Sequence, residues 1–516
     1  QEGISDVRFK IVLLKGIQLY KGLLLKHGVV IRDERYKKSL KDLAADKSGK
    51  ATFKRIRGPA SPPLLFVSRT AIGPQGQAVG SIATNPEEVD QIVQSIWSKV
   101  YDGNIVNTFE HVVEFLGKYR DFLFIAPTFK IDPITGIDLH KSATTAAKTA
   151  GGLDGWAPAD WALLPLKAFD QLAVLLNRIE EGAPWPEGVL HGKATFLCKT
   201  PEPSLEALDY RILLILPLLY RRWASVRLAN LRPWVASWSL DCMFAGIPGK
   251  GADEAWYESA VRVEHAKLHG NVITGAASDI QKCFDQISRL LLCVLLVLGG
   301  MPLCIARTYL NFHENLRVYN SLAGGLGKPY FKKFSIPQGC PFSMMFIAFL
   351  LRVVANMCQT LHPGVFFRML ADDILILYVG QQINLFVNAF EAINHFLKDM
   401  GAIVSAKKSF TFSSDPNFRA WLRGYHWLST NSKLQVHLSF RDLGAQLSVG
   451  NRMVGTMATK RMGSALDSIR RIRRLPSSYE SKATLLLSKS TSLGLYGCEV
   501  SPIGEVALSS MTAAIA

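Results

Sequence analysis

The chain contains 516 residues, of which 48% are hydrophobic and 20% are charged, and its formal net charge is +17 at pH 7. This composition suits a globular, core-forming protein of about three folded units and excludes a chain without a folded core. The positive charge favours a polyanionic partner, most simply nucleic acid, although a basic surface that only aids solubility would have the same composition.

The cysteines and the longest apolar run indicate which compartment and which kind of helix to expect. The eight cysteines form no C-x-x-C pair, so neither a zinc knuckle nor a redox motif is visible, and a reducing, intracellular compartment is expected. The longest apolar run, residues 290–306, contains Gly299, Gly300 and Pro302. This pattern favours a buried core helix that ends at the two glycines over a membrane span, and no membrane partner is expected.

The sequence of the first half of the chain predicts a basic extension, then helices, then strands. Residues 1–60 are strongly basic and lead into a Pro-rich break. Asn85, followed by Pro-Glu-Glu, predicts a capped helix, and further helices are expected over residues 161–182. Residues 192–230 predict two strands that run into a helix. Residues 246–260 predict a glycine-rich loop that opens a helix, without the Gly-Lys-Ser/Thr pattern of a phosphate-binding loop.

Two acidic patches in the second half carry the chemistry. Asp279 ends an apolar run, and Asp372-Asp373 lies between two runs rich in Phe, Leu, Ile and Tyr, which predicts a strand, a tight turn and a strand. If these strands are neighbours in one sheet, Asp279 and Asp372 converge and repel each other unless cations lie between them. Two divalent ions bridged by carboxylates are how polymerases drive attack on a nucleoside triphosphate. The alternative is an ordinary Asp-Asp turn.

A loop between the acidic patches completes a family pattern. Its sequence is SIPQGCPFS at residues 335–343, followed by an apolar helix. Together with D-x-x-x-x-F-D at Asp279 and A-D-D at Asp372, this order resembles reverse transcriptases, most closely those of LINE-type (non-LTR) retrotransposons. Flanking segments also resemble the family: Lys148 with residues 152–155, residues 196–199, residues 210–211, residues 401–409 and, weakly, Trp427.

The resemblance implies an α+β fold of the right-hand polymerase type, with helical fingers, an antiparallel palm sheet and a helical thumb. The expected division is a basic N-terminal extension over residues 1–85, fingers over residues 86–268, a palm with an interleaved fingers segment over residues 269–425, and a thumb over residues 426–516.

The resemblance also implies a metal centre. Asp279 and Asp372, assisted by the carbonyl of Ile280, would ligate two Mg²⁺ ions, for which Mn²⁺ can substitute. Oxygen ligands suit these ions, and no His or Cys competes in this segment. Asp373 would support the hairpin or bind metal at the edge.

The incoming nucleotide would meet a second set of residues. Lys199 and Arg211 would bind the triphosphate, Arg211 through its bidentate fork. Phe284 would lie under the sugar, where its ring would clash with a 2′-hydroxyl and admit deoxynucleotides. RNA-dependent RNA polymerases have an Asp at this spacing, whereas Asp285 is one position late and is expected to be structural.

The remaining implied contacts are with the nascent base pair, the leaving group and the duplex. Gln338 and Gly339 would shape the loop against the nascent base pair. Lys408 would protonate the leaving pyrophosphate as a general acid, although the adjacent Lys407 leaves the register open. A basic helix in the thumb would contact duplex phosphates without reading bases. Its residues are Lys460, Arg461, Arg470, Arg471, Arg473 and Arg474.

Two departures from the family pattern leave alternatives open. Leu370 stands where the family usually has Tyr or Phe, and Ile212 stands where it usually has Pro. The predicted function is RNA-templated DNA synthesis for a retroelement. An RNA-dependent RNA polymerase and a catalytically inactive nucleic-acid-binding remnant are the rivals. The expected partners are an RNA template, a DNA primer and deoxynucleotides, the expected location is the nucleus, and the chain reads as part of a longer polyprotein with an endonuclease not seen here.

Overall fold

The structure is a computed structural model that describes residues 63–145, 149–200, 202–322, 324–475 and 477–515, together with positions 18–20, 22–23, 26–31, 33–34, 37–38 and 41. The chain divides into two compact units. The larger comprises Ser61–Leu443 and Leu447–Met453, and the smaller comprises Gln1–Ala60, Gly444–Gln446 and Val454–Ala516. The four predicted domain ranges stay predictions, and Lys148 and much of the predicted basic extension lie outside the described residues.

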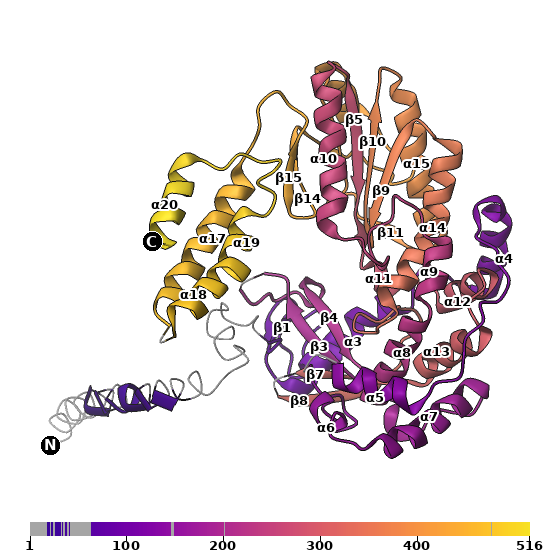
Figure 1. Ribbon diagram of the computed structural model, residues 1–516, viewed down its shortest axis with the longest axis vertical. Helices are drawn as coiled ribbons and strands as arrows, with labels where there is room; N and C mark the ends of the chain where they lie inside the picture. Colours follow the sequence, from indigo (N-terminus) through magenta and orange to yellow (C-terminus); the bar gives the residue numbers. More distant parts are fainter. Residues whose placement is uncertain are drawn as a thin grey trace. The chain divides into compact units, whose positions relative to one another are not determined.

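Five strands form the main sheet of the larger unit, in the order β13-β12-β5-β10-β9 (Figure 1). They are β5 (Ile273–Ser278), β9 (Val365–Leu370), β10 (Asp373–Val379), β12 (Phe410–Ser413) and β13 (Gln435–His437). β10 lies between β5 and β9 and runs antiparallel to both, whereas β12 and β13 pair in parallel. The predicted antiparallel palm sheet is therefore confirmed, apart from this edge pair.

Strand β10 of this sheet is apolar because helices cover the sheet. Residues 374–378 of β10 are all buried, as expected of a strand with both faces packed. Helices α10 (Ala252–Leu268), α14 (Ser343–Leu361) and α15 (Ile383–Asp399) pack on the sheet. Among the described residues, α14 alone is long and apolar enough to cross a membrane by length and composition, and most of its side chains are buried within the protein.

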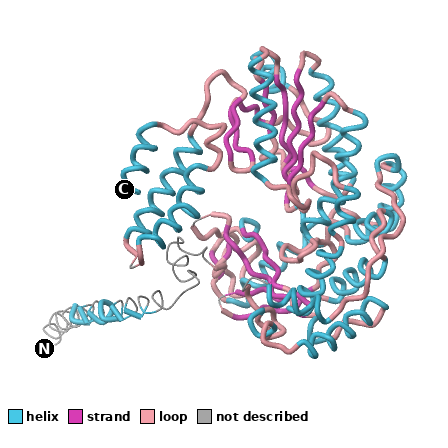
Figure 2. The backbone as a smooth tube through the Cα atoms, in the orientation of Figure 1, coloured by secondary structure: helices cyan, strands magenta, loops and turns pink. Residues whose placement is uncertain are grey.

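Four further strands form a second sheet in the order β4-β3-β7-β8 (Figure 2). They are β3 (His191–Cys198), β4 (Tyr210–Ile215), β7 (Arg317–Leu322) and β8 (Gly325–Tyr330). β3 and β4 are antiparallel and lead into helix α8 (Leu218–Asn230), so the predicted strand pair and following helix are confirmed. β7 joins this sheet beside β3 in parallel, which brings a segment from after the Asp279 strand back to the strands that precede it.

Helix α3 (Pro86–Tyr101) begins at the predicted cap and anchors the edge of the second sheet. The side chain of Asn85 accepts hydrogen bonds from the backbone N–H groups of Glu87 and Glu88. One turn later, the carboxylate of Asp90 accepts from the amide of Asn320 and from the backbone N–H of Lys328, both at 2.8 Å. Asp90 therefore ties α3 to both strands of the β7–β8 hairpin.

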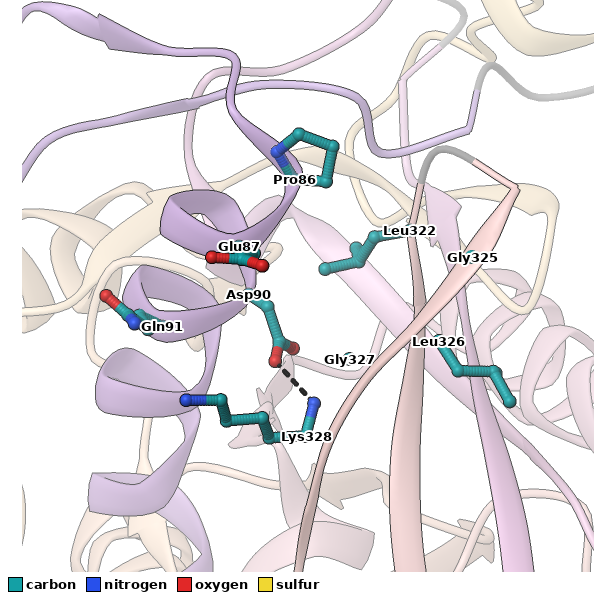
Figure 3. A pocket seen from close by; sticks show the side chains of 9 residues that line it. All are labelled: Pro86, Glu87, Asp90, Gln91, Leu322, Gly325, Leu326, Gly327 and Lys328. Atoms are coloured by element: carbon teal, nitrogen blue, oxygen red, sulfur yellow. Dashed lines mark hydrogen bonds between the residues drawn. The ribbon is translucent and has the colours of Figure 1, made fainter.

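A pocket of about 200 Å³ lies at this anchor (Figure 3). Gly327 lines it, directly against Asp90, and a Cβ atom at Gly327 would come within 2.3 Å of the Asp90 carboxylate. The close approach of strand to helix therefore requires glycine at this position.

The predicted core helix after Asp279 is present. α12 (Arg289–Leu298) is largely buried and ends at Gly299, as predicted, and α13 (Leu303–Asn315) follows Pro302. The larger unit also contains β1 (Val67–Ser68), β2 (Ile82–Ala83), α4 (Thr108–Lys118), α5 (Gly136–Thr145), α6 (Pro158–Trp161), α7 (Leu166–Glu181), α9 (Arg232–Trp238), β6 (Ile280–Gln281), α11 (Cys283–Gln286), β11 (Ile403–Val404) and α16 (Pro416–Gly424). The short strands β14 (Ser439–Asp442) and β15 (Ala445–Ser448) follow in sequence.

The smaller unit is helical where it is described at the C-terminal end. It contains α17 (Thr456–Arg473), α18 (Tyr479–Leu485), α19 (Ser492–Leu495) and α20 (Glu505–Ile515). Met462 and Ile469 of α17 pack against Met511 of α20 to form its core. The predicted helical character of this end of the chain is confirmed.

Candidate active site

The sheet register brings the two acidic patches to one edge of the main sheet. Ser278, the last residue of β5, pairs with Ile374 of β10. Continuing this antiparallel register by one residue places Asp279 opposite Asp373, with Asp372 immediately beyond. The turn between β9 and β10 contains Ala371 with φ of 54°, a left-handed conformation that closes the predicted tight hairpin. We call Asp279, Asp372 and Asp373 the acidic edge.

The electrostatics show that these carboxylates are close neighbours. Burial raises the pKa of Asp372 to about 6, and the negative charges of Asp373 and Asp279 add to the increase, while Arg211 opposes it. Burial also raises the pKa of Asp373, with Asp279 again contributing and Arg368 opposing. Such shifts are typical of buried carboxylates that share a site.

A divalent ion fits this edge on the evidence of one buried carboxylate oxygen that accepts no hydrogen bond. Oδ2 of Asp279 is buried and accepts no hydrogen bond from any described residue. The backbone around it is held in place, because the N–H of Asp279 donates to Oγ of Ser409 at 3.0 Å and its carbonyl accepts from the N–H of Ser405 at 2.8 Å. The charged neighbour of this oxygen is Nζ of Lys408, an ion pair at 3.5 Å, and a fixed carboxylate oxygen that accepts no hydrogen bond is suited to a cation.

The protein side chains alone would not complete a metal coordination shell. Within the described ranges, no group of three or more His, Cys, Asp and Glu side chains could hold a metal ion. Ile280, whose carbonyl is the predicted assisting ligand, begins the short strand β6 and pairs with Val404 of β11.

Three lysines lie close enough beside the acidic edge for their charges to interact. Nζ of Lys408 lies 3.5 Å from Oδ2 of Asp279. The charges of Lys199 and Lys408 both reach Lys282, whose pKa is lowered to about 7, chiefly by burial. The predicted residues Lys199 and Lys408 are therefore brought to the site, together with Lys282, which the sequence analysis did not single out.

Lys282 has a defined environment that explains its position. Its Nζ donates to the carbonyl of Leu208 at 2.6 Å and of Tyr210 at 3.1 Å, and it lies 4.4 Å from the centre of the Trp97 ring. The sequence signal that could have identified it is its place in the Asp279 motif, three residues after the aspartate.

Arg211 and the predicted loop both connect the second sheet to this site. Arg211 is exposed on β4, and its charge lowers the pKa of the nearby Asp372. The carbonyl of Gln338 accepts from the N–H of Leu214 on the same strand at 2.8 Å. Gly339 has φ of 123°, and a Cβ there would come within 2.2 Å of the Leu214 carbonyl. Only glycine suits this close, positive-φ contact.

Phe284 and Asp285 have different surroundings, as their roles require. Phe284, on the single-turn helix α11, is half-buried, and its carbonyl accepts from the N–H of Ile336 at 2.7 Å. Asp285 is buried, and its carboxylate lies 3.9 Å from Nζ of Lys332. Lys332 in turn lies 4.0 Å from the centre of the Tyr101 ring. Asp285 is thus engaged inside the protein, which agrees with its expected structural role.

The remaining predicted residues lie elsewhere. Trp427 is fully buried, and its backbone pairs with Ser432 in an isolated bridge, which resembles a short hairpin. Arg461 is half-buried, donates to the carbonyl of Gly444 at 2.9 Å and lies 4.4 Å from the Tyr496 ring. The other basic residues of the predicted thumb helix are exposed: Lys460, Arg470, Arg471 and Arg473 on α17 and Arg474 at its C-terminus.

The chain was compared with known proteins. No curated protein matches the sequence. One similar solved structure is "apo telomerase from Candida Tropicalis truncated from C-terminal domain", with 10% sequence identity and a TM-score of 0.36, covering 55% of this chain and 59% of the telomerase chain.

A protein-family model also matches, and it covers the segment that contains the acidic edge and the loop. The expected α+β polymerase fold is confirmed. Residues 200–445 match the family described as "Reverse transcriptase (RNA-dependent DNA polymerase)".

Proposed function

We propose that this protein is the RNA-directed DNA polymerase of a non-LTR retrotransposon, which extends a primer 3′-hydroxyl with deoxynucleotides on an RNA template. The observation that carries the proposal is the acidic edge. Asp279 and Asp372 meet at one end of the sheet, and an oxygen of Asp279 is left buried without a hydrogen-bond donor.

The residues at this edge would have different roles in the reaction. Asp279 and Asp372, with the Ile280 carbonyl and with Asp373 at the margin, would hold two Mg²⁺ or Mn²⁺ ions. When bound, such a pair lowers the pKa of the attacking hydroxyl and neutralises charge on the triphosphate and on the leaving pyrophosphate. Lys408, beside Asp279, would then give a proton to the departing pyrophosphate.

Positive side chains around the acidic edge would orient the triphosphate. Arg211 offers a planar fork that can bind phosphate oxygens in pairs, and Lys199 and Lys282 add compact charges. Arg211 lies on β4 and Lys199 directly follows β3 of the same sheet, whereas Lys282 lies in the segment after β5, so the three residues converge only in the folded chain. Gln338 and Gly339 would form the surface that contacts the nascent base pair.

Sugar selection is assigned to Phe284. Its half-buried ring would exclude a 2′-hydroxyl by contact, since the neighbouring Asp285 is paired with Lys332 and is not available to accept a hydrogen bond from the sugar. This arrangement supports deoxynucleotide over ribonucleotide incorporation.

Extension of a primed RNA template tests the function directly. We expect the protein to incorporate deoxynucleotides in the presence of Mg²⁺, and Asp372→Asn to abolish extension while RNA binding persists, because only the metal-holding charge is removed. Both can be measured on one labelled primer, by gel and by fluorescence anisotropy. Extension with ribonucleotides only, or full activity of Asp372→Asn, would refute the proposal.

A silent nucleic-acid-binding remnant is the second candidate, and Leu370 is the observation that favours it. Leu370 pairs with Asp373 at the end of the β9–β10 hairpin, where the resembled family has an aromatic residue. Absence of extension together with tight, salt-sensitive RNA binding would identify this alternative.

The wider context belongs to the same proposal. The exposed basic residues of α17 would contact the backbone of the RNA–DNA hybrid. The chain would act as part of a longer polyprotein that supplies an endonuclease, and it would work in the nucleus, where the target DNA is found.

A further inference from the structure

A basic pocket lies in the larger unit, between helices α5 and α8. It has a volume of about 660 Å³, and its charged lining residues are Lys141, Arg222, Arg232 and a single carboxylate, Asp138. The carboxylate is already engaged, because Asp138 Oδ2 accepts from the N–H of Thr135 at 3.0 Å and from its hydroxyl at 2.6 Å. The pocket therefore keeps an excess of positive charge.

Arg222 is the unusual member of this lining. It is only 8% exposed, and its Nη1 donates to the carbonyl of Ser142 at 2.9 Å. Its Nε is buried and has no hydrogen-bond partner among the described residues. Burial lowers the pKa of Arg222, and the charge that adds to this effect is that of its neighbour Arg221. A buried guanidinium beside another cation is unfavourable unless an anion is supplied.

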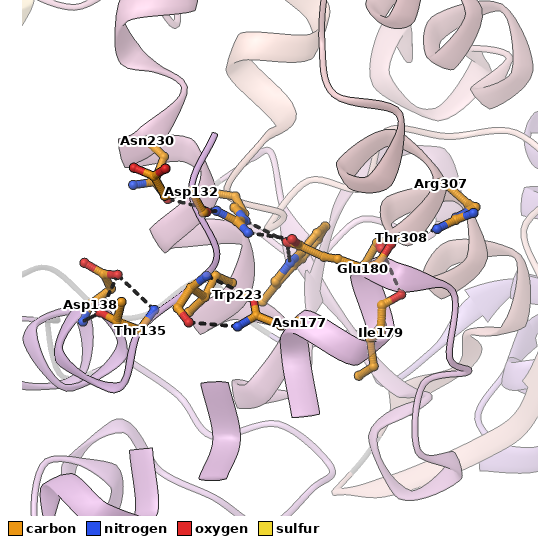
Figure 4. Close-up of polar contacts among 12 residues, drawn as sticks. Asp132, Thr135, Asp138, Asn177, Ile179, Glu180, Trp223, Asn230, Arg307 and Thr308 are labelled. Atoms are coloured by element: carbon orange, nitrogen blue, oxygen red, sulfur yellow. Dashed lines mark hydrogen bonds and ion pairs between the residues drawn. The ribbon is translucent and has the colours of Figure 1, made fainter. Parts of the chain in front are cut away.

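The same helix carries a second buried arginine, Arg227, whose charge is paired within the chain. Arg227, five residues later, donates through Nε to Glu180 at 2.6 Å and through Nη1 to the carbonyl of Asp132 at 2.7 Å. Glu180 also accepts from Nε1 of Trp223 at 2.7 Å, so both charges of this pair are satisfied (Figure 4). Arg222 is similarly buried but has no such carboxylate among the described residues, which indicates that its anion comes from outside the chain.

We propose that the Arg222 pocket binds a backbone phosphate of single-stranded RNA, without reading its sequence. A buried guanidinium whose Nε has no hydrogen-bond partner among the described residues suits paired phosphate oxygens, and the exposed Lys141 and Arg232 would add charge at the mouth of the pocket. The net charge of +17 favours a polyanion over a small acid. The proposal rests on the proposed function in taking this strand to be the template.

Salt-dependent RNA binding tests the pocket. Binding of a labelled single-stranded RNA is measured by anisotropy at several salt concentrations, without divalent metal and without nucleotides. Arg222→Gln, Lys141→Gln and Arg232→Gln should each weaken binding severalfold and lower the slope of log K against log salt by about 0.7 for each lost phosphate contact. The control is Arg262→Gln, which removes an exposed arginine that is paired with Glu258 on α10, and it should leave both quantities unchanged.

The exposed positions keep the test decisive if Arg222→Gln does not fold. Folded Lys141→Gln and Arg232→Gln proteins with wild-type affinity and slope would overturn the pocket assignment. A thermal shift with inorganic phosphate alone, together with unchanged RNA binding in the variants, would assign the pocket to free phosphate and also overturn it.

The polymerase proposal fails independently of this pocket. Wild-type protein that does not extend primers, but whose slope falls in the variants, refutes the polymerase function and retains the RNA site. Wild-type protein that extends primers, but whose slope does not change in the variants, refutes the RNA site alone.

Discussion

Individual side chains at the acidic edge differ in how well the sequence identified them. Asp279, Asp372 and Phe284 stand at motif positions that a linear pattern can locate. Lys282 stands in the same motif, but its importance depends on Trp97 and on two carbonyls near residue 209, which reach it only through folding. The sequence thus supplied the acids, while the cation beside them became evident from contacts.

Phe284→Ala should relax sugar selection. Removing the half-buried ring opens space for a 2′-hydroxyl, so ribonucleotide incorporation should rise by at least tenfold relative to deoxynucleotide incorporation, which corresponds to about 1.4 kcal/mol of lost discrimination. The ratio of kcat/KM for the two nucleotides measures this. Phe331→Ala removes an exposed ring and should leave the ratio unchanged; continued exclusion of ribonucleotides in Phe284→Ala would remove the gate assignment.

Lys282→Met should weaken nucleotide binding. Methionine preserves the apolar stem over Trp97 but removes the charge, so KM for the deoxynucleotide should rise roughly tenfold, as for loss of one charge-assisted hydrogen bond. Steady-state extension at varied nucleotide concentration measures it. The matched control is Lys267→Met, because Lys267 also donates to a backbone carbonyl, that of Gly450, from α10. Equal KM values for the two variants would contradict a role at the triphosphate.

Connections between elements depend on a few close contacts. The link from α3 to the β7–β8 hairpin joins residues more than 200 positions apart, through Asp90, Asn320 and Lys328. The sequence predicted the helix and its cap at Asn85, because these depend on neighbours in the chain. It did not predict the partner of the helix, because no local pattern marks Gly327 as the point of contact.

Gly327→Ala should therefore destabilise the protein. The new methyl group would overlap the Asp90 carboxylate, so either the strand or the hydrogen bonds must shift, at a cost of about 1–3 kcal/mol. Urea unfolding measures the change. Gly325→Ala on the same strand is the control, since a Cβ there meets its nearest neighbour at 3.8 Å. Equal stability of the two variants would show that the hairpin adjusts freely.

The larger unit as a whole contains a buried histidine that makes the stability of the fold depend on pH. His313 is buried with its Nε2 2.9 Å from the Tyr220 hydroxyl. Burial lowers the pKa of His313 well below its usual value, and the positive charges of Arg289 and Lys332 lower it further. In the unfolded chain the same imidazole takes up a proton near pH 6.5. Below that pH the unfolded state binds more protons, so stability must fall as the solution becomes acidic.

His313→Gln should reduce this loss of stability in acid. Glutamine can still accept from Tyr220 but does not titrate, so the free energy of unfolding should decline less between pH 7.5 and pH 5.5, by up to about 1.4 kcal/mol per pH unit below the unfolded pKa. Urea midpoints of both proteins at the two pH values measure the difference. Asp372, whose pKa is raised to about 6, has the opposite effect on stability, but it is common to both proteins and cancels. If the free energy of unfolding fell equally with pH in both proteins, the assignment of this effect to His313 would be contradicted.

The sequence by itself determined the elements and the acidic motif of this protein, because caps, apolar periodicity and motif spacing are local properties of the chain. It therefore located the strand before Asp279, the hairpin at Asp372 and the loop at Gln338. Tertiary structure alone added Lys282 to the cations that the resemblance had already named, and it alone decided which buried charges are paired. Arg227 and Arg222 lie on one helix, yet only the folded chain brings Glu180 to one and no carboxylate of the described residues to the other. Charge pairing depends on distance in space, and residues 180 and 227 become neighbours only when the core closes around them.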